Sequence, residues 1–338
     1  MTTIAPVKWG ILSTAKIGMQ KVTPAIQKGK LCLVAALASR DAAKAKQAAG
    51  ELGIPKAYGS YEDLLGDPDI EAIYNPLPNH LHVPWSVKAA EAGKHVLCEK
   101  PIALTAAEAR TLVDARDRAG ILIQEAFMVR HHPQWIRAGE LVRGGRIGAL
   151  RAIQGFFSYT NLDPANVRNQ VDIGGGGIYD IGCYPIVTSR YLFGEEPTRV
   201  AATLDRDPNF KTDRLASAIL EFPNGQASFV CSTQLVSYQR MQIFGTERRI
   251  EIEIPFNAPP DRACRLFIDD GKVLGGAGAE IETCKAVDQY TTQADAFAKA
   301  IRTGEPLEFP LEDAVKNMHV IDALFRSAKE GCWAKVEG

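Results

Sequence analysis

Three side chains in this sequence have the types and spacing needed to move a proton on and off a substrate oxygen. Lys100 follows the apolar run 95–98, and a proline directly after it stops the chain from continuing as a regular strand. This places an ammonium group at the end of a buried strand, where it can point into a cleft. Asp180 and Tyr184 follow the glycine run 174–177. If that stretch is helical, the carboxylate and the phenol share one face.

Length, composition and charge limit the class of protein. The 338 residues suffice for two ordinary domains, and 46% hydrophobic with 23% charged residues is usual for a globular enzyme. A net charge of −1 gives no electrostatic case for nucleic acid or an anionic membrane. We expect no membrane-spanning helix and no signal peptide. The seven scattered cysteines, without a Cys-x-x-Cys pair, indicate free buried thiols and a cytoplasmic location.

Strands and helices alternate over residues 1–125. Helical patterns separate five apolar runs: Val7 to Leu12, Leu31 to Ala38, Ile70 to Tyr74, His95 to Cys98 and Ile121 to Gln124. Asp41 is placed to cap one helix, and Thr105 with Glu108 has the spacing of a capping box. The alternation predicts an α/β fold with a doubly wound parallel sheet, which binds ligands at the carboxyl ends of its strands. The residues that fall there are Ser13, Ser39, Asn75 and Lys100.

The first strand–helix turn is a weakened dinucleotide fingerprint. The spacing Gly-x-Gly-x-x-Gly falls on Ser13, Ala15 and Gly18, so only the last glycine is present. Small residues still let the backbone approach a pyrophosphate at the helix N-terminus. The expected phosphate-binding residues are Ser13, Thr14, Ala15, Lys16 and Ile17. A plain strand–turn–helix without a ligand is the alternative.

The end of the second strand bears on the choice of cofactor. NAD sites usually place Asp or Glu here for the ribose hydroxyls, whereas this chain has Ser39 and Arg40. A hydroxyl and a guanidinium suit a ribose 2′-phosphate, and the arginine can stack on adenine. The sequence therefore favours NADP. Asp41 follows directly and leaves NAD open, and a solvated helix-start residue is the alternative for Arg40.

An ordered set of motifs resembles the glucose–fructose oxidoreductase and inositol dehydrogenase (Gfo/Idh/MocA) family over nearly the whole chain. The motifs are Tyr74 to His82, Glu99-Lys100-Pro101, Glu125 to Pro133, the glycine-rich segment before Tyr179, and Arg190 to Gly194. The resemblance implies an N-terminal Rossmann domain, residues 1–125, and a substrate-binding and oligomerisation domain, residues 126–338. It also implies a cis Lys100–Pro101 bond and an α+β second domain. The open, mostly antiparallel sheet of that domain mediates dimers or tetramers in the family.

The sequence after Gly148 independently supports such a sheet. The strand-like stretches are Ala149 to Tyr159, Thr198 to Leu204, Leu215 to Phe222, Gln226 to Gln234, Met241 to Phe244 and Arg249 to Ile254. Asn224-Gly225 supplies a hairpin turn. Late helices are expected over 294–302 and 311–329, and the last helix is a candidate to pack back on the first domain.

The tyrosine at position 184 resembles one subgroup of the family. Inositol dehydrogenase-like members have histidine there, whereas glucose–fructose oxidoreductase, aldose dehydrogenases and dimeric dihydrodiol dehydrogenase have tyrosine. The resemblance implies an NADP-dependent dehydrogenase that oxidises C1 of a cyclic aldose such as D-xylose to the lactone. The alternatives are a trans-dihydrodiol dehydrogenase, a ketose or anhydrofructose reductase, and a non-catalytic NADP sensor. No export signal or cofactor-trapping N-terminal arm is expected, so the cofactor should dissociate.

Hydride transfer to a nicotinamide also needs a base for the hydroxyl proton. The ordinary pKa of tyrosine, about 10, is too high for a base at neutral pH, and a nearby ammonium lowers it. We therefore assign Tyr184 as proton acceptor, assisted by Lys100, which also binds the substrate oxygen. Asp180 then orients Lys100 or binds a second hydroxyl. Lys100 as the acid–base group stays open, as do a surface turn for Lys100, a core aromatic role for Tyr184 and a helix cap for Asp180.

Other residues are expected around the ligands. The nicotinamide side of the cofactor is assigned to Asn75, Pro76, Leu77, His80, Glu99 and Lys100. The substrate is assigned to Arg130, Arg168, Tyr159, Asp180 and Tyr184, with structural ion pairs as the alternative for both arginines. No metal site is expected, because neither histidine pair, 80/82 or 131/132, has a carboxylate or cysteine at ligand spacing.

Overall fold

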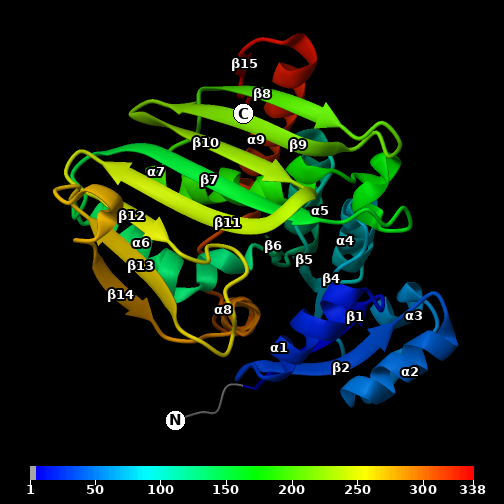
Figure 1. Ribbon diagram of the computed structural model, residues 1–338. Coiled ribbons are helices and arrows are strands. Elements are labelled where there is room, and N and C mark those ends of the chain that lie inside the picture. Colours follow the sequence, from blue (N-terminus) through cyan, green and yellow to red (C-terminus); the bar gives the residue numbers. More distant parts are fainter. Residues whose placement is uncertain (1–4) are drawn as a thin grey trace. The chain divides into compact units, whose positions relative to one another are not determined.

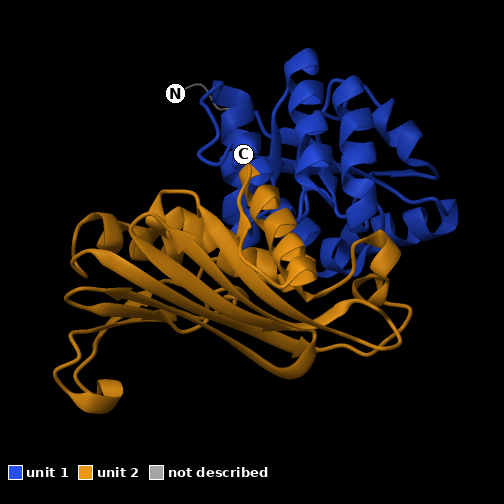
Figure 2. Cartoon of the chain, turned by 90° about the horizontal axis from the view of Figure 1, so that it is seen from above, with its two compact units in different colours: residues 1–128, 289–315 blue, residues 129–288, 316–338 orange. Residues whose placement is uncertain are grey.

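The computed structural model describes residues 5–338, and the chain divides into two compact units. Unit 1 comprises Met1–Met128 and Gln289–Val315, and unit 2 comprises Val129–Asp288 and Lys316–Gly338 (Figure 2). No helix within 5–338 combines the length and the apolar character needed to cross a membrane. The predicted domain boundary after residue 125 stays a prediction, and each unit is described separately below.

A six-stranded parallel sheet forms the centre of unit 1 (Figure 1). Its strands are β1 (Val7–Leu12), β2 (Cys32–Ala38), β3 (Lys56–Tyr58), β4 (Ala72–Asn75), β5 (His95–Cys98) and β6 (Ile123–Glu125). The strand order is β3-β2-β1-β4-β5-β6, and every neighbouring pair is parallel. The order reverses at β1, where doubly wound sheets bind ligands. The predicted doubly wound α/β fold is therefore confirmed.

Helices pack on both faces of this sheet. They are α1 (Thr23–Gln27), α2 (Ala42–Leu52), α3 (Tyr61–Leu65), α4 (His82–Glu91), α5 (Ala106–Ala119) and α8 (Gln289–Thr303), with short helical turns η1 (Gly18–Val22) and η2 (Asn79–Leu81). Trp9 of β1 is fully buried in one core cluster with residues of α1, α2 and α8, and its ring centroid lies 5.7 Å from that of Phe297. Gly10 faces the other side, where a Cβ would lie 2.7 Å from Leu64 of α3.

The predicted helix caps are present. Asp41 accepts hydrogen bonds from the backbone of Ala43 and Lys44 at 3.0 and 3.1 Å. Thr105 accepts from the Glu108 backbone at 3.1 Å, and the Glu108 carboxylate reaches back to the backbone at residue 104. These bonds satisfy N–H groups that have no partner inside the helix. Local sequence therefore sets where α2 and α5 begin.

Unit 2 is built on a nine-stranded sheet in the order β14-β13-β12-β11-β7-β10-β9-β8-β15. Its strands are β7 (Leu150–Thr160), β8 (Arg199–Arg206), β9 (Asp213–Phe222), β10 (Gly225–Ser232), β11 (Gln234–Gly245), β12 (Arg249–Ile252), β13 (Cys264–Asp269), β14 (Glu280–Cys284) and β15 (Ala334–Lys335). Within residues 5–338, β7 and β10 are the only neighbouring strands of this sheet that run parallel. The hairpin joins Phe222 to Gly225 as predicted. The sheet is therefore mostly antiparallel, as expected.

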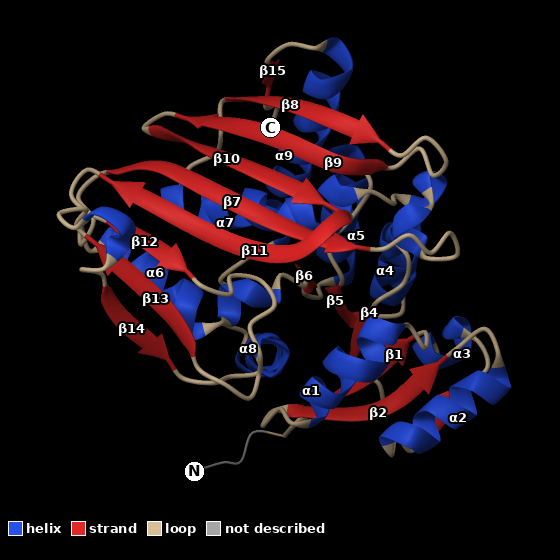
Figure 3. Ribbon diagram, in the orientation of Figure 1, coloured by secondary structure: helices blue, strands red, loops and turns tan. Residues whose placement is uncertain are grey.

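One face of this sheet is covered by helices (Figure 3). The helices are α6 (Pro133–Arg143), α7 (Cys183–Phe193) and α9 (Leu311–Glu330). The short helical turns are η3 (Met128–His131), η4 (Val167–Asn169), η5 (Val171–Ile173), η6 (Ile178–Gly182) and η7 (Leu274–Gly276), the last of which projects away from these helices (Figure 2). In β9, Ala216, Ala218 and Leu220 are buried while Ser217 and Ile219 are exposed. Six of the seven cysteines are buried free thiols, as predicted, but Cys332 is exposed in the turn after α9.

Candidate functional site

The predicted cofactor residues of unit 1 lie at the carboxyl ends of its parallel strands. Ser13 directly follows β1, and its N–H donates to Ala38 at the end of β2 at 2.8 Å. Glu99, directly after β5, donates from its N–H to Asn75 at the end of β4 at 3.0 Å. Because the strands are parallel, these ends share one edge of the sheet. The structure therefore brings the predicted cofactor residues to one edge.

The turn after β1 has the shape of a glycine turn without its first two glycines. Ser13 adopts φ 72, the left-handed region that glycine favours. Its hydroxyl accepts a hydrogen bond from the Ala15 backbone at 3.2 Å, which helps a non-glycine residue hold this conformation. Residues 13–17 are all at least partly exposed. The turn therefore leaves its backbone accessible to a phosphate group.

The end of β2 presents a hydroxyl and a guanidinium. Ser39 accepts from the Asp41 backbone at 3.3 Å, and Arg40 is exposed. Burial raises the pKa of Tyr61, and a hydrogen bond with Arg40 partly offsets this rise. The Asp41 carboxylate is committed to capping α2. One oxygen of the acidic group that could favour NAD at this position is therefore engaged in the cap, and the other lies 4.0 Å from Lys44 Nζ.

Buried polar groups fix the loop after β4. The Asn75 amide donates to the His82 carbonyl and the Ser86 hydroxyl, both at 3.1 Å. These bonds join β4 to α4 inside unit 1. The His82 ring nitrogens lie 2.7 Å from the carbonyls of Leu77 and Pro101. Burial lowers the pKa of His82 to about 4, so the ring is neutral at pH 7 and donates to one carbonyl at a time. A ligand role for Asn75 stays a prediction.

The remaining residues assigned to the nicotinamide side differ in exposure. Pro76 and Leu77 are buried, whereas His80 and Glu99 are partly exposed. Buried proline and leucine side chains can border a cofactor only through their backbone or through an edge of the side chain. The role assigned to each of these residues remains a prediction.

The chain around Lys100 is held on both sides by buried hydrogen bonds. The Tyr74 hydroxyl donates to the Glu99 carboxylate at 2.7 Å, and the Ile102 N–H donates to the Glu125 carboxylate at 2.7 Å. Burial and then the Glu99 charge raise the pKa of Tyr74 well above its usual value, so its hydroxyl stays a donor. The Lys100–Pro101 bond is cis, as the resemblance implies. The backbone that carries the Lys100 ammonium is thus well defined.

In unit 2, Asp180 and Tyr184 lie on a helical segment whose first turn is wider than expected. Residues 178–182 form a π-helical turn, closed by the Cys183 N–H on the Ile178 carbonyl, and α7 follows. Gly182 lies against β10, where a Cβ would come 3.1 Å from the sulfur of Cys231. The expected helix is present, but α-helical spacing does not describe its start. Such wide turns are frequent at functional sites.

The Asp180 carboxylate accepts two bonds on one oxygen. The Tyr159 hydroxyl lies 2.5 Å and the Arg168 guanidinium Nε 2.9 Å from Asp180 Oδ2. Burial and the Asp180 charge raise the pKa of Tyr159 well above its usual value, so the hydroxyl remains a donor. Arg168 makes an ion pair, yet 41% of its side chain is exposed. Three residues predicted to contact substrate therefore meet in unit 2, and part of the Arg168 side chain is exposed.

Aromatic side chains surround the Tyr184 ring. Tyr184 is 6% exposed, and its ring centroid lies 5.8 Å from that of Phe157 and 5.4 Å from that of Phe256. Such packing fixes the direction of the ring and thus of its hydroxyl. Sequence reasoning missed both phenylalanines. Phe157 could have been found as an inward position of a predicted strand, but Phe256 lies in a loop without a signal.

Arg130 is buried in unit 2. It is 4% exposed and lies near His131. Burial, and then the charge of Arg130, lower the pKa of His131 to about 3. The neighbouring His132 accepts from the Gln134 backbone at 3.2 Å and caps α6. The assignment of Arg130 to substrate stays a prediction.

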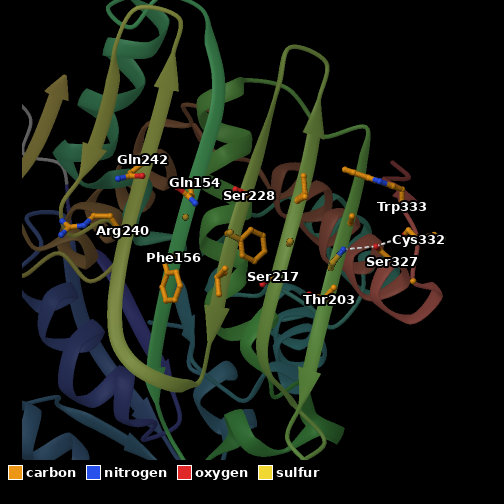
Figure 4. Close-up of a pocket in the computed structure, with 18 of the residues that line it drawn as sticks. Gln154, Phe156, Thr203, Ser217, Ser228, Arg240, Gln242, Ser327, Cys332 and Trp333 are labelled. Atoms are coloured by element: carbon orange, nitrogen blue, oxygen red, sulfur yellow. Dashed lines mark hydrogen bonds between the residues drawn. The ribbon is translucent and has the colours of Figure 1, made fainter. Parts of the chain in front are cut away.

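A hollow of about 690 Å³ lies on the face of the large sheet opposite α7 (Figure 4). Its lining includes Phe156, Ile219, Tyr238, Arg240 and Trp333. Figure 4 shows labelled side chains from several neighbouring strands along this face. None of the predicted catalytic or cofactor residues lines it, so the hollow is separate from the candidate site.

Comparison with known proteins assigns the family. Residues 7–127 match the model of the oxidoreductase family with an NAD-binding Rossmann fold, and residues 135–251 match the GFO/IDH/MocA C-terminal domain. The chain belongs to the Gfo/Idh/MocA oxidoreductase family. The predicted family is thus confirmed for both the strand edge of unit 1 and the Asp180–Tyr184 segment of unit 2.

Individual relatives of this Gfo/Idh/MocA protein are similar over almost its full length. An uncharacterized oxidoreductase from Rhizobium meliloti is 50% identical, covering 98% of this chain and 99% of that protein. A D-xylose 1-dehydrogenase (NADP(+)) from Haloferax volcanii is 40% identical over 97% of this chain and 99% of that protein. The crystal structure of KijD10, a 3-ketoreductase from Actinomadura kijaniata in complex with NADP and TDP-benzene, aligns with a TM-score of 0.89. The alignment covers 95% of this chain and 98% of KijD10, at 28% sequence identity. The predicted NADP agrees with the cofactor named for the last two.

The hydrogen bond from Tyr159 to Asp180 yields a stability prediction. Replacing Tyr159 by Phe removes a donor to a carboxylate, and such bonds contribute about 1.5–3 kcal/mol. We expect the free energy of unfolding from urea titration to fall by that amount. Tyr238→Phe is the matched control, because the Tyr238 hydroxyl meets Arg240 at 3.3 Å on a 47% exposed side chain. Equal losses of unfolding free energy in the two variants would contradict the hydrogen bond from Tyr159 to Asp180.

Proposed function

We propose that this protein is an NADP-dependent dehydrogenase that oxidises C1 of a cyclic aldose, a D-xylose-like pentose, to the lactone. One observation carries the proposal, the 40% identity over 97% of the chain with a D-xylose 1-dehydrogenase. The tyrosine-type motif with Asp180 and Tyr184 supports the same substrate class.

The residues of unit 1 suit NADP. Ser13 to Ile17 would bind the phosphates through an exposed turn, and Ser39 with Arg40 would bind the 2′-phosphate through a hydroxyl and an exposed guanidinium. When bound, NADP+ supplies the acceptor for the hydride from C1. Lys100, next to the cofactor edge, would bind the oxygen on C1 and lower its proton affinity.

The hydroxyl proton leaves as the C1–O double bond forms. We assign Tyr184 as its acceptor, because the ring is held by aromatic neighbours and Lys100 would favour the phenolate. Asp180 is held by Tyr159 and Arg168, so it would orient Lys100 or bind a second sugar hydroxyl with fixed geometry. The exposed part of Arg168 would contact another hydroxyl, and Arg130 remains a further substrate candidate. Lys100 as the proton-transferring group is the alternative.

A second candidate is the reverse reaction on a ketosugar. The similarity to KijD10, a 3-ketoreductase, favours it. The same three groups would then deliver a proton to a carbonyl oxygen during hydride addition. A trans-dihydrodiol substrate and a non-catalytic NADP sensor are further outcomes of the test below.

The direct test is NADPH formation with a panel of D-xylose, D-glucose, L-arabinose, myo-inositol and a trans-dihydrodiol, with NAD+ in parallel. We expect turnover of aldopentoses with NADP+ preferred. Tyr184→Phe should lower kcat at least about 100-fold, as expected for loss of general base catalysis, while NADPH still quenches protein fluorescence.

Other outcomes would redirect the proposal. Turnover of the diol alone would change the substrate class, and turnover of a keto sugar with NADPH alone would favour the reductase. NADPH binding without turnover of any substrate would favour the sensor. Near-normal turnover by Tyr184→Phe would remove the proton role from Tyr184.

We also infer that the protein works in the cytoplasm as a homodimer or homotetramer formed through the outer face of the large sheet. Its free cysteines, six of them buried, support the location. Exposed apolar residues on or beside that face support the interface: Ile219 is 40%, Tyr238 is 47% and Trp333 is 42% exposed. Apolar surface of this kind is stabilised when a second copy covers it.

Replacing Ile219 by Asp tests the interface. A carboxylate on the outer face of β9 would have to be buried on association, so we expect sedimentation to show monomers at about micromolar concentration where the parent chain is a dimer or larger. Leu274→Asp is the matched control, because Leu274 is 94% exposed in η7, outside the residues that line the hollow. A monomeric parent chain, or equal effects of both variants, would contradict the interface.

A further inference from the structure

The segment that carries Asp180 and Tyr184 begins at a buried helix start without a cap of its own. Gly177 is its N-cap position and has no side chain, and Ile178 is fully buried. Free N–H groups at a helix start need acceptors when water cannot reach them. Asp213, the first residue of β9, supplies one: its Oδ2 accepts from the Ile178 N–H at 2.6 Å. The acceptor thus comes from a strand distant in sequence.

The glycine turn fits closely around this carboxylate. Gly176 has φ +126, and a Cβ there would lie 2.0 Å from Asp213 Oδ1. The Gly176 N–H donates to the Arg168 carbonyl at 2.9 Å. One short turn therefore connects the segment bearing Arg168 to the helix bearing Asp180, and Asp213 fills the space on its other side. Glycine at 176 is required by both the conformation and the carboxylate.

Few charged groups face Asp213. It is 1% exposed, and Arg206 is opposite it in the register of β8 and β9, close enough for its charge to act on the carboxyl. Cys231 faces it from β10 as an un-ionised thiol, since burial raises the pKa of Cys231 well above its usual value. At the start of η6, the N–H groups of Gly177 and Ile178 face the Asp213 carboxylate. Burial raises the pKa of Asp213 to about 6, so the carboxyl is mostly ionised at pH 7 and above.

We propose that Asp213 is a positioning residue for the reaction: its carboxylate caps η6 and thereby fixes the directions of Asp180 and Tyr184. The activity part of this inference rests on the proposed dehydrogenase function. Asp213 acts through the helix that bears Asp180 and Tyr184. Its loss should therefore act on the chemical step and leave NADPH binding unchanged.

The sign of the stability effect separates positioning from a structural role. The folded pKa of Asp213, about 6, lies above the ordinary aspartate value of 3.8. The carboxyl therefore stabilises the fold when protonated, below pH 4, and that contribution is lost as the pH rises through 6. At pH 8 the ionised group costs folding free energy. Asp213→Asn removes that cost, which offsets the weakened cap, so the variant should melt close to the parent temperature at pH 8.

The experiment compares Asp213→Asn with Asp207→Asn. Asp207 is a matched control because it is 6% exposed and accepts backbone hydrogen bonds from Asn209 and Phe210 in the neighbouring hairpin. We expect kcat of Asp213→Asn to fall about 10- to 100-fold, as for small misplacements of reacting groups, because the amide offers one acceptor oxygen where the carboxylate offers two to the N–H groups around it. KM and NADPH affinity should change less than about 3-fold. The parent chain should lose kcat below pH 6, where protonation of Asp213 removes an acceptor, and the variant should lack this decline. Asp207→Asn should show none of these changes.

Amide hydrogen exchange gives a readout that needs no substrate. Peptides covering 176–184 should exchange about 10-fold faster in Asp213→Asn at pH 8, with no change over 207–212. Unchanged exchange and kcat within about 2-fold of the parent chain would overturn the proposal, as would a lower melting temperature with NADPH binding lost. Faster exchange in a chain that oxidises no aldose would instead keep the positioning role and reject the substrate.

Discussion

The Asp180 carboxylate, shared by the Tyr159 hydroxyl and the Arg168 guanidinium, is the interaction on which the candidate site of unit 2 depends. It joins the end of β7, the turn η4 and the start of the helix that carries Tyr184. A partly buried carboxylate is stable only when cations and donors compensate its lost hydration. Each of the three elements therefore has to be placed correctly for the other two to be stable.

The sheet and the glycine turn meet this constraint from opposite sides. Residues of β7 pack against α7, and residues of β9 and β10 pack against η6. Gly155 of β7 lets α7 come close, since a Cβ there would lie 3.1 Å from Pro185. The buried Asp213 carboxylate supports the start of the same helix. In unit 1, Tyr74 and Glu125 similarly fix the chain on either side of Lys100. The segments that carry the proposed reactive groups are thus held by hydrogen bonds and aromatic packing within their own units, which is what preorganised proton transfer requires.

Sequence reasoning predicted the fold well where local signals are strong. Periodicity and caps located α2, α5 and five of the six parallel strands but not β3, which has only three residues. The family motifs gave the mostly antiparallel sheet. It missed β13 and β14, because their residues alternate weakly, and the π-helical start at 178–182, because that geometry depends on contacts with β10. The cofactor edge followed from strand ends. Asp213 could not be predicted, because its role depends on a pairing between residues far apart in the chain.

The central claim is hydride transfer from C1 of a cyclic aldose to NADP+. Incubating the protein with D-xylose carrying deuterium at C1 and NADP+, followed by mass spectrometry of the nucleotide, tests it most directly. The account predicts NADPH with one added deuterium together with the lactone or its hydrolysis product. NADPH without deuterium, or no NADPH from a chain that binds the cofactor, would contradict it.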